Sequence, residues 1–498
     1  MLNNNLIRFS VPFLFIMLLA SSCTDLEETT FDLVTPDNFY NTEVELTAAV
    51  VPVYSSLAQA EWSDFIHLGA VSSDEIVIPT RGGDWDDGGI WRALQEHTWD
   101  ATLGFVGAGW SGPYGGIARA NSTLDNLGRA EQTDLVKTYI AEVRVLRALY
   151  YWWLMDLYGG VPIVTAAEAD EEPPARNTRT EVFNFIVEQI NLALPDLEVS
   201  HGTGGHGRIT TGAANTLLAT VYLNAAVYTG TAMWSQTLAA AEAVINSGEY
   251  NLLPTVMDVF SFDNEGVANT EYILVVPKLP LDGVQAFRHM ATLHYNQHSA
   301  SPWNGFSVLT DFYNSYDATD DRLDQILVGQ QYVLFGATAG DSAFDRADPP
   351  APLIFEVEFP LFDASEMDGP RILKWPIDPE TSQWFSGSDY AIFRYSHVLL
   401  MKAEAEFNLS GGGLASLNMV HERAGLDAFT TISADNIYWE RGHEFLWEGF
   451  RRTDQIRHGT FLDGYTLKET VSDDYRVLFP IPQSQMDANP NLVQNTGY

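Results

Sequence analysis

The chain has 498 residues, with 66 acidic and 26 basic side chains and a net charge of −40 at pH 7. This charge makes nucleic acid a poor partner, because phosphate recognition depends on Lys and Arg. It also disfavours a highly sulfated or uronate-rich ligand, which the long-range field would repel. A hydrophobic content of 46% is ordinary for a folded protein, so the acidity does not indicate disorder.

The first 22 residues are typical of a secretion signal. The apolar run 11–20 is too short to span a membrane as a helix, which needs about 20 residues. Small residues precede Cys23, the only cysteine, and this is the pattern that a lipoprotein signal peptidase accepts. We therefore predict a signal peptide over 1–22, lipidation of Cys23, a flexible tether over 23–35 and a single domain over 36–498.

Helical periodicity dominates the rest of the chain. From Asp134 to Tyr158, apolar residues recur every three or four positions, which indicates one face of a helix. Gly159-Gly160 and Pro162 are expected to end this helix. The same criteria predict further helices over 180–194, 213–228, 234–246, 390–408, 414–424 and 437–458.

Two regions, 74–116 and 251–383, are instead rich in Gly, Pro, Asp and Trp. The second contains a strand-like run from Tyr272 to Val276. Small residues on consecutive helices favour antiparallel hairpins of the tetratricopeptide type, and loops this long inside a compact protein are usually functional. We predict a mainly α fold: a tetratricopeptide-like helical-repeat scaffold with a large irregular, loop-rich cap containing short strands.

Several short motifs, in a fixed order along nearly the whole chain, carry a family resemblance. They include Tyr158-Gly159-Gly160-Val161-Pro162 and Phe479-Pro480-Ile481-Pro482. The others lie at 37–43, 114–121, 141–148, 207–210, 394–405, 440–454 and 489–498. In this order, behind a lipoprotein signal, they resemble the SusD/RagB family, the glycan-binding lipoproteins of Bacteroidota polysaccharide-utilisation systems. His397 stands where the family usually has an acidic residue.

The resemblance implies a non-catalytic protein with a tetratricopeptide-like scaffold. It also implies an outer-membrane, surface-facing location, with Cys23 anchored in lipid. The implied partners are a glycan and a SusC-like TonB-dependent transporter, over which the lipoprotein closes like a lid. Most of the matching Arg, Glu and Tyr residues are expected to be structural.

A sugar site needs flat aromatic faces and a few rigid hydrogen-bonding groups. The densest cluster of such residues runs from Asp74 to Trp99, and in the resembling family a second loop later in the chain contributes too. We predict that Trp85 and Trp303 stack on sugar rings, while Asp74, Arg81 and Asn304 hydrogen-bond hydroxyls. Weaker candidates are Glu75, Asp86, Trp91, Tyr295 and Asn296.

Other chemistries have less support in the sequence. Asp84-Asp86-Asp87 and Asp317-Asp320-Asp321 offer oxygens to Ca²⁺, but neither follows the EF-hand spacing. No nucleotide, zinc-protease or hydrolase motif is present, so no cofactor is expected. A glycoside hydrolase stays open, because it needs only a suitably spaced pair of carboxylates. A peptide-capturing lid and a protein that binds only its transporter stay open as well.

Overall fold

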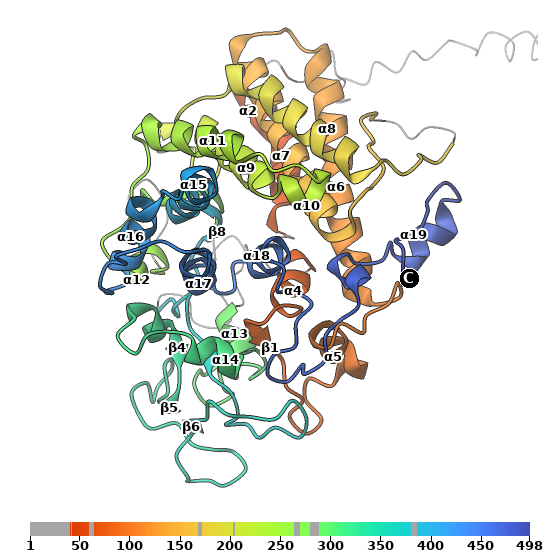
Figure 1. Ribbon diagram of the computed structural model, residues 1–498. Helices are drawn as coiled ribbons and strands as arrows, with labels where there is room; N and C mark the ends of the chain where they lie inside the picture. Colours follow the sequence, from red (N-terminus) through yellow and green to blue (C-terminus); the bar gives the residue numbers. More distant parts are fainter. Residues whose placement is uncertain are drawn as a thin grey trace, which may run out of the picture.

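The structure is a computed structural model that describes residues 40, 42–58, 64–167, 172–202, 205–262, 269–278, 288–379 and 386–498. The predicted signal peptide, Cys23 and the tether lie outside these residues. Helices pack together over one half of the molecule, and loops with short strands form the other half (Figure 1). The predicted mainly α scaffold with a loop-rich cap is confirmed.

The scaffold is a succession of antiparallel helices, in which α6 packs on α7, α7 on α8, α9 on α11, and α15 on α16. Its principal helices are α2 (Glu43–Ser55), α6 (Gly104–Arg129), α7 (Asp134–Tyr158), α8 (Arg179–Ala193), α9 (Thr211–Leu223), α10 (Ala225–Thr229), α11 (Trp234–Ser247), α15 (Tyr395–Ser410), α16 (Leu414–Arg423), α17 (Ala434–Glu444) and α18 (Arg451–His458). Among the described residues, none of the helices is both long and apolar enough to cross a membrane.

Helix α7 lies at the centre of the scaffold. Its predicted bounds, Asp134–Tyr158, are confirmed. The Thr133 hydroxyl accepts a hydrogen bond from the backbone N–H of Val136 and so caps the first turn, and Gly159, at a φ of 76°, ends the helix. Every residue from Val145 to Tyr158 is buried, so this helix is covered on all sides by its neighbours.

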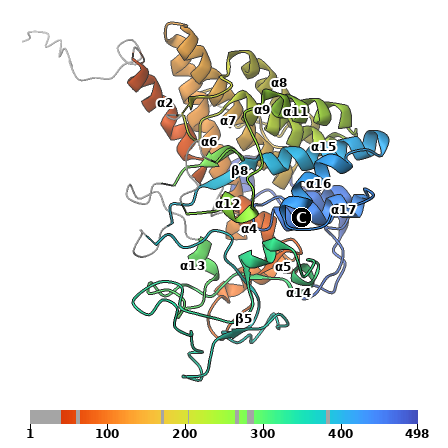
Figure 2. The ribbon, with the colours of Figure 1, turned by 90° about the vertical axis from the view of Figure 1, so that its left-hand side faces the viewer.

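Among the residues that the structure describes, the cap contains four two-stranded antiparallel sheets. Strand β1 (Ile76–Val77) pairs with β3 (Ser307–Val308), and β2 (Tyr272–Val276) pairs with β8 (Tyr390–Arg394). The other pairs are β4 (Ile326–Leu327) with β7 (Arg371–Ile372) and β5 (Gly329–Gln330) with β6 (Ile354–Phe355). Figure 2 shows β8 between the helices above and the loops below, so this strand connects the two halves.

A buried ionic network fixes the cap to the scaffold around Arg394, the last residue of β8. The Arg394 guanidinium donates to Glu448 at 2.8 Å from both Nε and Nη2, to Glu271 at 2.6 Å and to Glu444 at 2.8 Å. Lys374 donates to Glu448 at 2.6 Å. None of these five side chains is exposed by more than 1%. The three carboxylates therefore depend on Arg394 and its neighbours for compensation.

Four predicted elements are wrong. The predicted helix 213–228 is two helices, α9 and α10, which are separated at Asn224. Residues 390–394 form strand β8 and not the start of a helix, because they pair with β2. The predicted helix 437–458 is two helices, since Trp447 and Gly449 adopt φ angles of 59° and 86° that no α-helix accommodates. The region 74–116, predicted to be irregular, contains α5 (Ile90–Gln95) and the first half of α6.

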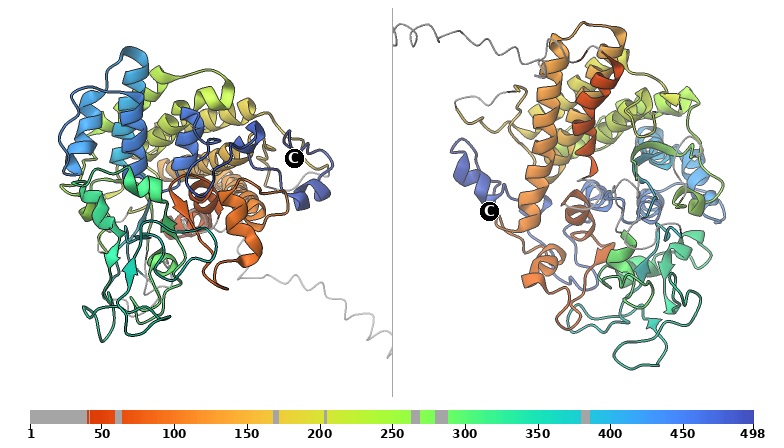
Figure 3. Two further views of the ribbon diagram at one scale, coloured as in Figure 1. Left: turned by 60° about the horizontal axis from the view of Figure 1, so that its bottom comes forward. Right: turned by 180° about the vertical axis from the view of Figure 1, so that it is seen from behind.

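The C-terminal segment returns to the scaffold. Its helix α19 (Gln483–Ala488) lies near α6, as the right-hand view in Figure 3 shows. The side chains of Asn489 and Asn491 donate to the backbone carbonyls of Pro174 and Pro173 at 2.9 and 2.6 Å. These bonds hold the segment that follows α19 against the loop that follows α7.

Candidate functional site

The two loops that carry the predicted stacking residues meet in the structure. Pairing of β1 with β3 brings the loop that follows Val77 beside the loop that precedes Ser307. The indole N–H of Trp85 donates to the carbonyl of Trp303 at 2.7 Å, and the Trp85 ring lies against Gly305. A Cβ at Gly305 would be 2.3 Å from the Trp85 ring, so this close approach requires glycine.

Trp85 and Trp303 are half-buried at the edge of the hydrophobic core. The Trp85 ring packs against Trp91 and Phe306 with centroid separations of 5.8 Å each. Its backbone adopts a left-handed conformation, with a φ of 63°. Each ring thus has one part packed in the protein and another part at the surface.

Arg81 and Asn304 do not face solvent. Arg81 is 5% exposed and donates to the carbonyls of Gly305 and Asp368 at 2.9 and 2.7 Å. Asn304 is fully buried; its amide oxygen accepts from Arg371 at 2.8 and 3.0 Å, and its amide nitrogen donates to the Glu366 carbonyl at 3.1 Å. We therefore reassign both residues from sugar contact to support of the loops.

Asp74 and Glu75, the first acidic residues of the predicted site, make their contacts within the protein. Asp74 forms a bidentate ion pair with Arg451 at 2.6 and 2.8 Å. Glu75 is fully buried, and neither of its carboxyl oxygens accepts a hydrogen bond of normal length from a described residue. Burial raises the pKa of Glu75 to about 8. Glu75 is therefore reassigned to the interior. Asp74, whose side chain is 17% exposed, is held by Arg451, and its predicted contact with a sugar stays a prediction.

Two of the weaker candidates near Trp85 serve local packing. Trp91 is 7% exposed, and its indole N–H donates to Asp87 at 2.7 Å. This burial removes it from the predicted contact surface. Asp86 is exposed and pairs with Arg92 at 3.0 Å. Its predicted contact with a ligand stays a prediction.

A polar and aromatic group that we call the cap cluster lies next to Trp85. It consists of Asp84, Tyr295, Arg346 and Glu366. The Tyr295 hydroxyl donates to Asp84 at 2.5 Å, and the Arg346 guanidinium carbon is 3.5 Å from the centre of the Tyr295 ring. Arg346 also donates to Glu366 at 2.7 and 3.0 Å. The side chains of Arg346 and Glu366 are 44% and 21% exposed, so this ordered group is accessible to a ligand.

The charges of the cap cluster are set by its contacts. Burial raises the pKa of Glu366, but the hydrogen bonds from Arg346 and His294 outweigh it and leave that pKa below its ordinary value. Burial lowers the pKa of His294 to about 4, so the imidazole is neutral at pH 7. Burial and the hydrogen bond to Asp84 raise the pKa of the Tyr295 hydroxyl, which therefore keeps its proton. At neutral pH the cap cluster offers carboxylates and a guanidinium in fixed positions.

Exposed rings continue the surface beyond the cap cluster. Tyr332 and Phe344 are 49% and 43% exposed, and Ile354 is 38% exposed. They lie on three extended segments in which buried and exposed residues alternate, with Ala343, Leu353 and Phe355 on the inner face. Asn296, a predicted site residue, donates to the carbonyl of Phe344 at 2.8 Å and so joins this tip to the cap cluster.

Sequence reasoning missed Arg346, Glu366, Tyr332 and Phe344. The period-two exposure around Tyr332 and Phe344 was the one available signal, and it is short and interrupted by turns. Arg346 and Glu366 had no local signal, because their roles depend on a contact with Tyr295 that only the tertiary structure creates.

In neither of the two predicted Ca²⁺ candidates are the carboxylates arranged around one position. Asp84, Asp86 and Asp87 bond to Tyr295, Arg92 and Trp91 respectively. Asp320 instead pairs with Arg322 at 2.8 Å. Within the described ranges, no group of three or more His, Cys, Asp or Glu side chains is arranged to hold a metal ion.

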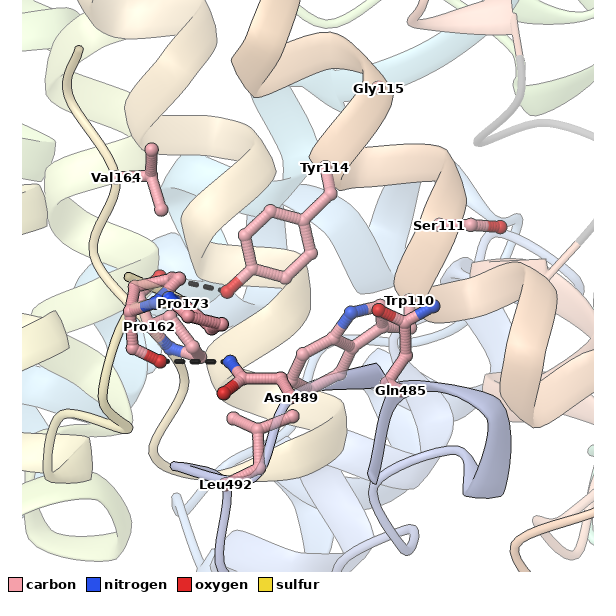
Figure 4. Close-up of a pocket in the computed structure, with 11 residues that line it drawn as sticks. Trp110, Ser111, Tyr114, Gly115, Pro162, Val164, Pro173, Gln485, Asn489 and Leu492 are labelled. Atoms are coloured by element: carbon pink, nitrogen blue, oxygen red, sulfur yellow. Dashed lines mark hydrogen bonds between the residues drawn. The ribbon is translucent and has the colours of Figure 1, made fainter. Parts of the chain in front are cut away.

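A separate, mostly apolar cleft of about 500 Å³ lies between α6, the loop after α7 and α19 (Figure 4). Trp110 and Tyr114 line it together with three prolines and Leu492. The Tyr114 hydroxyl donates to the carbonyl of Pro162 at 2.8 Å, so its polar atom is already used. Trp110 is 4% exposed. This cleft does not have the hydrogen-bonding groups of the cap cluster.

Comparisons with known proteins agree with this architecture. A family model described as "SusD family" matches residues 363–498, and one described as "Starch-binding associating with outer membrane" matches residues 34–223. The starch-binding protein SusD of Bacteroides thetaiotaomicron is 26% identical over 412 residues, which cover 72% of each chain.

Solved structures share the fold over most of the chain. A SusD superfamily protein from Parabacteroides distasonis matches with a TM-score of 0.77 at 22% identity, over 94% of this chain and 100% of the other. Surface glycan-binding protein A from Bacteroides thetaiotaomicron, in complex with laminarihexaose, matches with a TM-score of 0.75 at 23% identity, over 91% and 99%. The fold is that of the SusD superfamily. With the two sequence matches at either end, the chain belongs to the SusD-like family.

Proposed function

We propose that this protein is a cell-surface lipoprotein that captures an oligosaccharide or polysaccharide at its cap and delivers it to a partner TonB-dependent transporter. The observation that carries the proposal is the exposed, ordered cap cluster beside Trp85, Trp303 and the exposed rings of Tyr332 and Phe344. Similarity to proteins named for starch and glycan binding supports the ligand class.

The chemistry of the cap suits a sugar. The C–H face of a pyranose ring packs on an aromatic face, and charged groups form strong hydrogen bonds with hydroxyls. Asp84 and Glu366 supply acceptors and Arg346 supplies donors. The bond from Tyr295 to Asp84 and the bond from Arg346 to Glu366 hold these groups in place before a ligand arrives. Such preorganisation reduces the entropy lost on binding.

Binding without catalysis fits the charges of this surface better than hydrolysis. A glycosidase needs one carboxyl group that keeps its proton near neutral pH to protonate the leaving group. The pKa of Glu366 is lowered, and the raised pKa of Glu75 belongs to a fully buried side chain. The relatives named above are also described as binding proteins.

Calorimetry of the protein beginning after Cys23 tests the proposal, with laminarihexaose, maltohexaose and a panel of other neutral polysaccharides. We expect binding without product formation, and a loss of at least about tenfold in affinity, or 1.4 kcal/mol, in Tyr295→Ala and in Trp303→Ala. Met419→Ala is the matched control, because Met419 is 47% exposed on α16, outside the cap.

Three results would point elsewhere. Release of shorter oligosaccharides would support the hydrolase. Binding of peptides in place of sugars would support a peptide-capturing lid. Normal uptake by cells that carry the Tyr295→Ala/Trp303→Ala protein would support a protein that contacts only its transporter.

The anchor is tested separately by Cys23→Ser in the full-length chain. We expect the variant to leave the membrane fraction and to lose labelling by a radioactive fatty acid. Retention in that fraction with no fatty-acid label in either protein would overturn lipidation at this residue.

A further inference from the structure

A polar cavity lies away from the cap cluster, between the segment that follows α14 (Thr310–Asn314), the end of α16 and α17. Its volume is about 400 Å³, and it shares no lining residue with the cap cluster. Helix α17 supplies one wall through Asn436, Trp439 and His443, which recur at helical spacing on one face. Phe429, in the loop after α16, supplies a second aromatic wall.

The floor of this cavity is already organised. His421 bonds to Glu440 at 2.7 Å, and its ring stacks on Phe429 with a centroid separation of 3.8 Å. The Nε2 atom of His443 bonds to the Ser315 hydroxyl at 2.8 Å. These hydrogen bonds pair the polar groups of the floor with one another. The floor is therefore ordered, and the bonded atoms need no partner from a ligand.

The groups at the mouth are not satisfied in the same way. Trp439 is half-exposed, and within the described ranges its indole N–H has no hydrogen-bond partner. The Asn436 amide oxygen accepts from Ser433 at 2.7 Å, but its amide nitrogen makes no bond to a described residue. Asp435 is exposed, and its carboxylate likewise bonds to none of the described residues. The mouth therefore presents two donors and an acceptor beside aromatic rings.

We propose that this cavity is a second saccharide-binding site, which takes a neutral sugar residue of the glycan that the cap captures; it rests on the proposed function. A sugar hydroxyl accepts from Trp439 and Asn436, another donates to Asp435, and the C–H face of the ring packs on Trp439 or Phe429. An apolar ligand would bury these polar groups without partners, which is unfavourable.

Charge argues for a neutral sugar over an ionic ligand. Asp317, Asp427 and Asp435 surround the mouth and would repel a carboxylate or a sulfate. A cation would leave the N–H groups of Trp439 and Asn436 without an acceptor. A neutral ring satisfies both kinds of group, because each hydroxyl donates and accepts.

Two sites on one chain have a measurable consequence. A glycan long enough to reach both gains a second, intramolecular binding event, so its affinity exceeds that of a short oligosaccharide without any new contact at the cap. Loss of either site would then reduce the affinity for the long chain towards that for the short one.

The test is fluorine NMR of the protein labelled with 5-fluorotryptophan, beginning after Cys23. The signals of Trp439 and Trp303 are assigned by their loss in Trp439→Phe and Trp303→Phe. Laminarihexaose and maltohexaose are the probes. We expect the Trp439 signal to shift with one of them, both in the unaltered chain and in Tyr295→Ala/Arg346→Met, and Asn436→Ala to weaken that response by about threefold to tenfold.

Each signal reports on one site, so the two proposals can fail independently. A Trp303 signal that moves while that of Trp439 stays fixed overturns the second site and leaves the cap assignment intact. The opposite pattern supports the second site and overturns the cap assignment. Fixed signals for both residues with both probes overturn both. Met419→Ala, which lies outside either site, must not change any response.

Discussion

Two regions of this molecule contain the same kind of contact, an arginine between a glutamate and an aromatic ring, but one is buried and the other is exposed. In the network around Arg394, a guanidinium makes a bidentate contact with Glu448 and lies 5.1 Å from the centre of the Phe260 ring. In the cap cluster, Arg346 makes a bidentate contact with Glu366 and lies 3.5 Å from the centre of the Tyr295 ring. The first pair is fully buried, whereas Arg346 and Glu366 are 44% and 21% exposed.

The two regions differ in how strongly water hydrates their charged groups. A buried ion pair has lost its hydration, so removing one partner leaves a charge that nothing compensates. An exposed pair keeps most of its hydration and contributes little to stability, but it offers hydrogen bonds to a ligand. Similar contacts therefore fix the cap to the scaffold in one region and form the proposed binding surface in the other.

The largest effect on stability is expected from Arg394→Met. Three buried carboxylates would lose their main partner, and the free energy of unfolding should fall by about 3–5 kcal/mol. Urea unfolding at pH 7, followed by tryptophan fluorescence, measures this change. Arg346→Met is the matched control and should change stability by no more than about 1 kcal/mol while weakening glycan binding. Equal losses of stability in the two variants would contradict the comparison.

The next effect concerns the contact between the two loops. In Gly305→Ala the new methyl group would be 2.3 Å from the Trp85 ring, so the ring must move. We expect a loss of about 1–3 kcal/mol in the free energy of unfolding, together with weaker glycan binding. Thermal unfolding and calorimetry check this. Gly83→Ala is the control, because no atom lies within 4 Å of the corresponding position. A normal glycan affinity in Gly305→Ala would indicate that Trp85 does not contact the ligand.

Glu75 gives the cap a pH dependence that can be removed. Its pKa in the folded protein is about 8, above the ordinary value of 4.5, so between these pH values the folded state holds a proton that the unfolded state has lost. This contribution to stability is fully present below pH 4.5 and is lost as the pH rises towards 8, at up to about 1.4 kcal/mol per pH unit.

Glu75→Gln cannot titrate, so the variant should gain stability relative to the unaltered protein as the pH rises through this range. Urea unfolding between about pH 5 and pH 8 measures the difference in slope. Glu188→Gln, an exposed position on α8, is the control and should leave the slope unchanged. If the free energy of unfolding varied with pH in parallel for Glu75→Gln and the unaltered protein, a group other than Glu75 would be the one that titrates.

The smallest effect is expected from Tyr295→Phe, which removes only the hydroxyl that donates to Asp84. The ring still packs under Arg346, so the free energy of unfolding should change by about 1 kcal/mol or less. Glycan affinity should fall by a few-fold, less than in Tyr295→Ala. A loss as large as that of Tyr295→Ala would mean that the hydroxyl, and not the ring, makes the principal contact.

Much of the scaffold could be predicted because its signals are local. The apolar period of α7 and the glycine after Tyr158 define that helix without reference to other parts of the chain. The run from Tyr390 to Arg394 misled us because it is buried on both faces, so it has no alternation and simply extends the apolar pattern of α15. Periodicity alone cannot distinguish such a strand from a helix.

The site was harder to predict for a related reason. Trp85 and Trp303 could be proposed together because the family resemblance placed both loops at a ligand. Arg81 and Asn304 looked equally suitable, since their sequences do not reveal that Gly305, Asp368 and Arg371 use their polar atoms. Exposure depends on contacts between distant segments, and no single segment determines it.

The connection between β8 and α15 has a mechanical consequence. Residue 394 ends the strand and residue 395 begins the helix, so no loop separates cap from scaffold at this point, and Arg394 clamps the junction on both sides. Hinges in proteins are loop or terminal residues that absorb large changes of φ and ψ. At this junction there is no loop, and the ion pairs of Arg394 hold the terminal residue in place, so we expect little change of φ and ψ here. We therefore expect cap and scaffold to move together at this junction, so that any pivot used in the proposed delivery of a ligand would lie elsewhere.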